Sequence, residues 1–419
     1  RGGRGAGLAG GQMTRVMLVM TCALALSLGL APAAAAQPLS GVARDVGGGG
    51  QRAHLTRAST YQLPYGGGPV LHANRTHLIF WQPSGSGLSF EAGYMPLMQG
   101  FLGNVAADSH TTTNPYGLTG QYTDSRGPAT YDSSYGGSVT ATDRLPANGC
   151  VEPPVTGPGW TVCLTDAQLS SEIEHVISLN HLPTTSQDVY FLVTPKGLGS
   201  CLDSTSNSCA LGGQASGYCG YHSQTANGQA LYAVIPYNAV SGHCQSDNPR
   251  PNGNPADPAL STLSHEHNEL ITDPKDDAWI DHSGNENGDL CITNFGPAIG
   301  GSGQSAYNEA IHGGHYYLQE EWSNADGSCQ ARTRPDSVRF AVGRVSGPRH
   351  PVRLSGQAAA PGRSIVGYAW SFGDGRRGRG RQVSHRFSRT GRYTVVLRAT
   401  DSWGNWAFYA RAIRVSGTR

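Results

Sequence analysis

Two hydrophobic patterns alternate along the middle of the chain: short continuous apolar runs, and longer stretches with apolar residues three and four positions apart. A continuous apolar run closed by Pro or Gly predicts a buried strand, whereas the three-and-four spacing predicts a helix with one apolar face. Because helices and strands interleave, we expect an α/β or α+β body, large enough to form one core. The predicted strands are 77–81, 189–194 and 232–235, and the predicted helices are 90–107, 165–182 and 257–273.

Two of these helices carry their own start signals. Thr165 can cap a helix while Gln168, three places on, reaches back to it. Asp257 followed by Pro258 marks the start of the later helix, since Asp is a good cap and Pro suits the first turn. Residues 109–160 are rich in Ser, Thr, Tyr, Gly and Pro, so long loops or irregular strands are expected there.

The N-terminal stretch has the pattern of a secretory signal. Arg15 precedes an apolar run over 16–30, and a run of four Ala follows. This pattern predicts that residues 1–36 are a cleaved signal peptide, with the residues before Met13 as an extension of the start; an uncleaved membrane anchor is the alternative. No later run approaches 18 apolar residues, so no membrane association is expected after cleavage. Residues 37–65, with four glycines in a row, predict a flexible linker.

Eight cysteines follow the one in the leader. An even number in an exported protein predicts four disulfides, and proximity along the chain favours pairs of neighbours. Zinc held by thiolates is the alternative, but no CxxC pair supports it. The favoured pairs are Cys150 with Cys163, Cys201 with Cys209, Cys219 with Cys244, and Cys291 with Cys329.

The predicted 257–273 helix carries an HExxE sequence. His265 and Glu269, one turn apart, can hold one metal ion, while Glu266 can direct its carboxylate at a metal-activated water. The spacing therefore predicts His265 and Glu269 as metal ligands and Glu266 as the catalytic base. The alternative is that these residues form the solvated face of an amphipathic helix. His267 falls among the apolar positions, so we expect a buried, hydrogen-bonded histidine rather than a ligand.

A tetrahedral site needs a third protein ligand, and Glu286, 17 residues after Glu269, is favoured because zinc peptidases with a distant glutamate have a similar layout. Zinc is the expected ion, but Glu269 in place of a second His makes the ligand set richer in oxygen, which favours calcium or manganese as alternatives. The segment 281–289 also alternates oxygen-bearing side chains as a calcium loop does, although it lacks the EF-hand Gly and final Glu; a plain Asn/Gly turn is the other interpretation. The candidates for the third ligand are Asp273, Asp281, Glu286 and Asp289.

The net charge of +1 is the sum of an acidic part and a basic part of the chain. Residues 38–335 carry 11 Lys+Arg against 26 Asp+Glu, whereas residues 336–419 carry 16 Arg, no Lys, no Glu and 3 Asp. The arginines could bind an anionic wall polymer, nucleic acid or the acidic body, or they could reflect composition alone. Because no aromatic strip is interleaved with them, specific nucleic-acid binding is not expected.

Several short motifs lie between residues 70 and 330: 77–81; 164–183 with 190–191; 219–222; 264–274 with Glu286 and Cys291; and 307–308, 316–318, Trp322 and Cys329. Together they resemble the plant EXORDIUM, or phosphate-induced protein, family and its bacterial relatives. The resemblance implies a secreted, cell-wall-linked domain over residues 66–333 and assigns it no reaction.

A second likeness concerns the order of elements. A Cys-Gly turn, an edge strand at 232–235 and a helix bearing His-Glu are similar in order to zincin metallopeptidases, which implies a zincin-like fold. Glu269 and the lack of a clear Met-turn depart from that pattern.

The C-terminal segment resembles a PKD domain. Residues 368–375 read YAWSFGDG, and HRF at 385–387 and GRYTVVL at 391–397 follow. Over residues 336–416 this resemblance implies a seven-stranded, immunoglobulin-like β-sandwich that serves as a spacer or adhesive module. Within the last motif every second residue, from Tyr393 onward, is expected to point inward.

These observations lead to one leading hypothesis and one alternative. The leading hypothesis is a secreted, envelope-associated, zinc-dependent hydrolase, and among hydrolases a peptidase, whose partner is a cell-envelope polymer or an extracellular polypeptide. The alternative is a non-catalytic cell-wall or adhesion protein with the same scaffold.

Overall fold

The computed structural model describes most of the chain after residue 60 and a short piece before it. The signal peptide predicted for 1–36 and most of the linker predicted for 37–65 lie outside the described residues. Where the predicted linker is described, the prediction is wrong: Val42–Arg44 forms strand β1 and Leu63 is buried, because both find partners in the body that the local sequence does not reveal. The described residues are 42–45, 61–111, 113–151, 159–212, 216–332, 336–360, 364–402 and 406–417.

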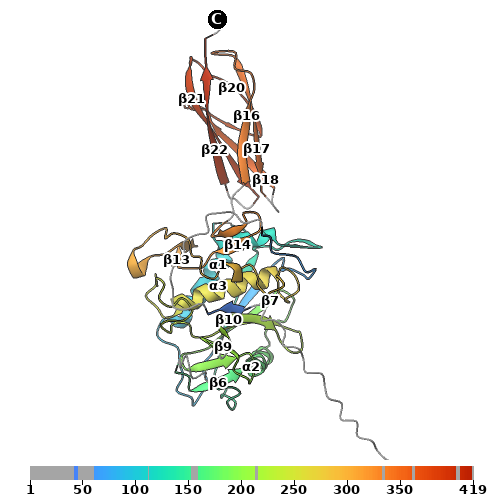
Figure 1. Ribbon diagram of the computed structural model, residues 1–419, viewed down its shortest axis with the longest axis vertical. Coiled ribbons are helices and arrows are strands. Elements are labelled where there is room, and N and C mark those ends of the chain that lie inside the picture. The colour runs from blue at the N-terminus through green and yellow to red at the C-terminus, as the bar shows by residue number, and fades with distance from the viewer. Residues whose placement is uncertain are drawn as a thin grey trace, which may run out of the picture. The chain divides into compact units, whose positions relative to one another are not determined.

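A nine-stranded mixed sheet forms the centre of the body (Figure 1). Its order is β5-β2-β7-β11-β10-β9-β8-β6, with β1 paired to β10 off this path. The neighbours from β5 to β11 are parallel, whereas β10 is antiparallel to both β11 and β1. The predicted strands at 77–81, 189–194 and 232–235 are confirmed as β2, β7 and β11. The remaining bounds are β2 Asn74–Trp81, β5 Ser133–Ala141, β6 Val162–Thr165, β7 Asp188–Val193, β8 Leu198–Cys201, β9 Ser208–Ala210, β10 Ser216–Gln224 and β11 Leu231–Ile235.

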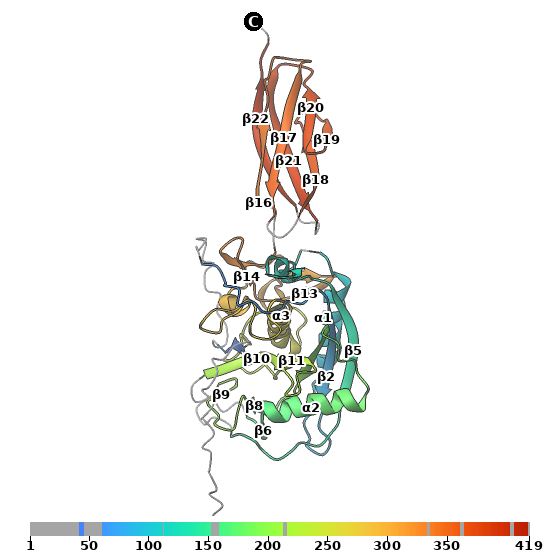
Figure 2. The same ribbon diagram turned by 90° about the vertical axis from the view of Figure 1, so that its right-hand side faces the viewer.

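Helices cover both faces of this sheet (Figure 2). Phe80 and Phe191 pack in the core formed with α1 and α3, while Trp81 and Leu192, one position on, pack in the core formed with α2. Since both faces are buried, β7 and β11 are apolar at nearly every position. The three predicted helices are confirmed as α1 Tyr94–Ala107, α2 Asp166–Leu179 and α3 Ala256–Thr272.

Local contacts confirm the cysteine pairing and the predicted cap, and they correct two other expectations. All four favoured disulfides are present, and the backbone N–H of Thr165 donates to the side chain of Gln168. Cys219 and Gly220 lie inside strand β10 and not in a turn. The expectation of an edge strand at 232–235 is also wrong, because β11 pairs with β7 on one side and β10 on the other. The zincin-like fold stays a prediction.

Short elements complete the body. The region expected to be loops and irregular strands includes η1, β3, β4 and the longer strand β5. In the described part of the chain, no helix is both long and apolar enough to cross a membrane. The short elements are η1 Pro115–Gln121, β3 Thr123–Asp124, β4 Gly127–Pro128, η2 Asp289–Cys291, η3 Gly303–Ser305, β12 Glu309–Ile311, β13 Gly314–Tyr316, β14 Glu321–Ser323 and β15 Ser328–Gln330.

The C-terminal segment is a seven-stranded β-sandwich, as predicted. One sheet has the order β16-β17-β20 and the other β19-β18-β21-β22. Val395 and Leu397 point into a core around Trp370 and Phe387. The strands are β16 Asp336–Val342, β17 Pro351–Ala359, β18 Ile365–Ser371, β19 Arg377–Arg379, β20 Gln382–Arg386, β21 Gly391–Asp401 and β22 Trp406–Val415.

Candidate metal centre

Helix α3 is buried along its whole length, so it has no solvated face. His265, Glu266 and Glu269 are each fully buried. The alternative that these residues form the wet side of an amphipathic helix is therefore excluded. Since unpaired buried charges are strongly unfavourable, the polar groups on this helix need partners inside the protein.

His265 lies among carboxylates. Its Nε2 is 3.1 Å from Oε2 of Glu269, one turn along α3, and 3.8 Å from Oδ1 of Asp289 at the start of η2. Neither ring nitrogen of His265 has a partner in hydrogen-bonding geometry. The backbone N–H of Asp289 donates to Oε1 of Glu269 at 3.0 Å, which holds the η2 turn against the helix. Atoms of these three residues lie within 4.8 Å of one another, a spacing that suits a shared metal ion.

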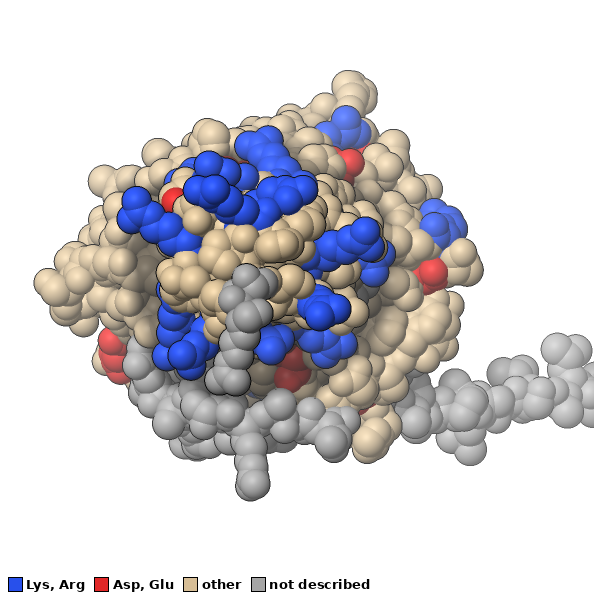
Figure 3. Space-filling model, turned by 90° about the horizontal axis from the view of Figure 1, so that it is seen from above, with Lys and Arg blue, Asp and Glu red and all other residues tan. Residues whose placement is uncertain are grey.

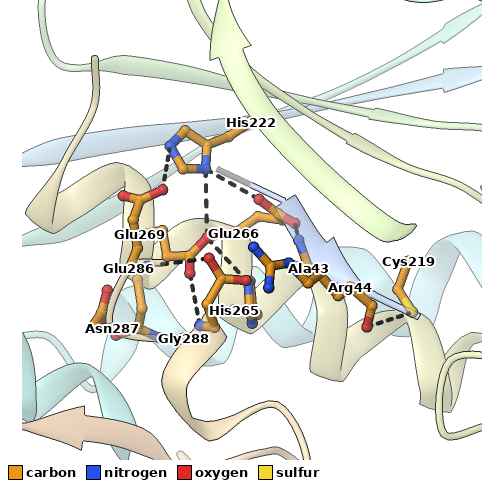
Figure 4. Close-up of polar contacts among 12 residues, drawn as sticks. Ala43, Arg44, Cys219, His222, His265, Glu266, Glu269, Glu286, Asn287 and Gly288 are labelled. Carbon is orange, nitrogen blue, oxygen red and sulfur yellow. Dashed lines mark hydrogen bonds and ion pairs between the residues drawn. The ribbon is translucent and has the colours of Figure 1, made fainter. Parts of the chain in front are cut away.

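A second histidine, His222 of β10, faces the same cluster from the sheet (Figure 4). Its Nδ1 is 3.2 Å from Oε2 of Glu266 and 3.7 Å from Oε2 of Glu269. Its Nε2 is 3.6 Å from Oε2 of Glu286 and 3.3 Å from the carbonyl oxygen of Asp273. We did not predict His222 as a site residue, because only the pairing of β10 beside α3 brings it there. The Cys-Gly-Tyr-His motif that contains it was the available signal.

Glu286, the favoured third ligand, is fully buried in this cluster. Its two carboxylate oxygens form no hydrogen bond, and they group with His222 and Asp276. The carboxylate that groups with His265 and Glu269 is that of Asp289. Glu286 and Asp289 therefore both lie in the cluster. The role of Glu286 as third ligand stays a prediction.

Asp281, another candidate, serves a different purpose. It accepts hydrogen bonds from the backbone N–H groups of Ser283 and Asn285, and from the hydroxyl of Tyr61. These bonds close an Asx-type turn at the start of the 281–289 segment. The calcium loop suggested by the spacing of this segment stays a prediction.

Burial dominates the electrostatics of the cluster. It raises the pKa of Glu286, Asp289 and Glu321 well above the usual range for carboxyl groups. Burial opposes the charging of His222, but the hydrogen bond to Glu266 and the nearby carboxylates raise the pKa of His222 to about 9. Within the described residues, the ion pairs of Arg side chains with acids lie elsewhere, at Asp124, Asp188 and Glu309. Carboxylates outnumber histidines in this cluster, and a divalent cation would offset their negative charge.

The residues fit such an ion chemically and sterically. Imidazole and carboxylate ligands suit zinc, and the surplus of oxygen also suits manganese. The loop can approach because position 288 is glycine: a Cβ there would lie 2.7 Å from Nδ1 of His265 and 2.9 Å from Oε1 of Glu269.

Not every polar residue of α3 faces the cluster. His267 bonds to the hydroxyl of Tyr116 and to Oδ1 of Asn74, as expected of a buried core histidine.

Comparison with known proteins identifies the C-terminal sandwich. Residues 333–409 match the family described as PKD domain. This segment is a PKD domain. It is similar to the PKD1 domain of Vibrio anguillarum Epp (27% identity, 20% of this chain and 96% of that chain, TM-score 0.19) and to that of the Vibrio cholerae metalloprotease PrtV (26%, 20% and 99%, TM-score 0.19). The PKD domain of human SorCS2 is 20% identical over 21% of this chain and 78% of that chain, with a TM-score of 0.19. No curated protein matches the chain.

The PKD domain presents arginines on the outer face of its four-stranded sheet. Ala369 of β18 pairs with Arg379 of β19 on one side and Arg398 of β21 on the other. Arg392 and Arg414 pair across β21 and β22. Residues paired in this way point to the same side of a sheet, and all four arginines are exposed. Seen from above, many Lys and Arg side chains and few acidic ones lie at the surface (Figure 3).

Proposed function

We propose that the protein is an extracellular, metal-dependent hydrolase, and specifically a peptidase, with a zincin-like body. The observation that carries this proposal is the fully buried His265, whose Nδ1 has no hydrogen bond and whose Nε2 lies within 4 Å of two carboxylates. A histidine so placed is arranged to coordinate a cation. Four disulfides and a PKD domain are consistent with an extracellular location.

Different residues of the chain would bind the ion, transfer the proton and orient the base. His265, Glu269 and either Asp289 or Glu286 would hold the ion, which when bound polarises a carbonyl and acidifies water. Glu266 follows the first ligand and would accept the proton of the attacking water, then return it to the leaving amine. His222, hydrogen-bonded to Oε2 of Glu266, would orient that carboxylate.

The proposal is tested by replacing the base. We expect Glu266→Gln to lower kcat/KM on an unfolded polypeptide by about 10²–10⁴-fold, because the amide cannot take a proton. A matched control is Glu174→Gln on α2, outside the cluster, which should keep the wild-type rate. Equal rates for wild-type and Glu266→Gln protein would contradict the assignment of Glu266.

The arginine face supports a second role, attachment to an anionic cell-envelope polymer. The face is exposed and formed by rows of paired strand residues, and Asp374 of the same domain bonds to His385. Attachment by this face would also serve a non-catalytic wall protein, so it does not depend on the metal centre.

A further inference from the structure

Strand β1 lies beside the proposed catalytic residues, although it comes from a segment that precedes the body in sequence. It pairs antiparallel with β10: Val42 with Tyr221, Ala43 with Gly220 and Arg44 with Tyr218. Because Tyr221 also pairs with Val234 of β11, β1 uses the opposite backbone edge of β10 at that residue. Strand addition at an edge of this kind is one way in which proteins bind extended polypeptides, through main-chain hydrogen bonds.

The strand contacts the proposed base directly. The backbone N–H of Ala43 donates to Oε1 of Glu266 at 3.3 Å (Figure 4). β1 also packs against α3, which carries His265 and Glu269, and against η2, which begins at Asp289. The partner of Ala43 on β10 is Gly220, where a Cβ would lie 3.0 Å from the same Oε1 atom. Strand, glycine and base are therefore in close contact.

Both ends of the short strand are fixed. Val42 is 4% exposed and Ala43 2% exposed, and they pack in the core that includes Tyr218 and Tyr221. After the strand, the carboxylate of Asp45 lies 2.6 Å from Nδ1 of His243 and accepts the backbone N–H of Cys244 at 3.0 Å. Side-chain packing and hydrogen bonds therefore hold β1 in place, as they would hold a bound peptide.

The centre beside β1 is closed to solvent in this structure. His222, His265, Glu266, Glu269 and Glu286 are all buried, four of them at 0% exposure and His222 at 2%. A substrate carbonyl cannot reach groups that solvent cannot reach. The uncut chain should therefore hydrolyse polypeptides at a low but measurable rate, limited by access to the centre.

We propose that β1 is an inhibitory strand seated in the substrate groove, and that the substrate is an extended polypeptide that binds antiparallel to β10 in its place. This inference rests on the proposed hydrolase function. The predicted signal-peptide cleavage near residue 36 would leave β1 attached, so activation requires a later cut between residues 46 and 60.

The experiment uses the full chain with a specific protease site inserted into the glycine run at 47–50, loaded with zinc. After cutting and removal of the released peptide, we expect polypeptide hydrolysis to rise at least tenfold and a chelator to remove the ion faster. A synthetic peptide of residues 38–46 should then bind in calorimetry and restore the low rate. Protein without the inserted site, treated with the same protease, is the control.

The outcomes separate the inference from the proposed function. If the cut protein neither speeds up nor binds the peptide, the inhibitory strand is refuted. If neither form hydrolyses polypeptides while the peptide still binds the cut protein, the groove is supported and the hydrolase is refuted.

Point variants of the uncut chain cover the case in which the cut protein unfolds. Ala43→Pro removes the N–H that Glu266 accepts, and Asp45→Ala removes the anchor at His243. Each should raise the rate of zinc removal by a chelator several-fold without a change in the circular dichroism spectrum. Unchanged removal in both variants would overturn the proposal.

Discussion

Two histidines on α3, two positions apart, have opposite surroundings. His265 is held among carboxylates, which raise its pKa well above the usual range despite the opposing effect of burial. His267 packs against aromatic rings, and burial lowers its pKa to about 3. Since successive helix positions are about 100° apart, a shift of two positions turns the side chain from the metal centre to the apolar core.

Among single residues, Gly288 gives the most specific prediction about metal binding. We expect Gly288→Ala to weaken zinc binding by about 10–100-fold, because the new methyl would press on His265 and Glu269 and displace the ligands. Gly103→Ala in α1 is the matched control: a Cβ there meets nothing within 4 Å, so it should bind zinc normally and gain about 0.5–1 kcal/mol of stability. Competition with a zinc-sensitive dye measures the zinc affinity of both variants. Equal affinities of Gly288→Ala and the wild type would contradict the steric account.

Among secondary-structure elements, the parallel pair β2 and β7 is joined by a charged cluster at its start. Asp188, fully buried, accepts hydrogen bonds from Arg75 and His77 of β2 and from Thr185. Although burial opposes it, these hydrogen bonds lower the pKa of Asp188 to about 2. The folded state therefore favours the charged form more than the unfolded chain does, whose Asp pKa is about 3.9.

The stability that Asp188 contributes should depend on pH in a defined direction. It is fully present above pH of about 4 and is lost as pH falls toward about 2, where the folded carboxyl takes up its proton. We expect Asp188→Asn to lower the free energy of unfolding by about 2–4 kcal/mol at pH 7, with the difference shrinking in acid. Urea titrations at several pH values measure this. Asp132→Asn, in an exposed pair with His110, is the control, and a pH-independent difference at Asp188 would refute the explanation.

The elements also show what the sequence could and could not predict. Local patterns were enough for α3 and β7, because periodicity, caps and apolar runs depend on neighbours in the chain. The approach of β1 and His222 to Glu266 depends on which strands pair with β10, and this pairing has no local signal. The HExxE spacing predicted the helical half of the candidate centre, whereas the proximity of Asp289 depends on how the η2 turn folds back onto α3.

For the whole molecule, the separation of an acidic body from a basic PKD domain predicts separate roles for the two parts. The PKD domain should hold the protein on an anionic polymer while the acidic body remains free of it. Four exposed ion pairs of a few tenths of a kcal/mol each add to about 1.4 kcal/mol, so replacing Arg379, Arg392, Arg398 and Arg414 with Gln should weaken binding to immobilised polyphosphate about tenfold. Binding of the full chain should also fall as salt rises.

The matched control for that experiment is the outer face of the three-stranded sheet. Arg339 and Arg353 are exposed there, and their replacement with Gln should weaken binding less. If both sets of variants bind as tightly as the wild type, the arginines do not form an attachment surface.

The central claim is that the buried cluster around His265 binds a metal ion, and the metal content of the purified full chain tests it most directly. After dialysis, elemental analysis should find about one equivalent of zinc in the wild type and in Glu266→Gln, where the base is not a ligand, and almost none in His265→Ala. A folded wild-type protein that retains no divalent ion, and takes up none when titrated with zinc or manganese, would contradict the account.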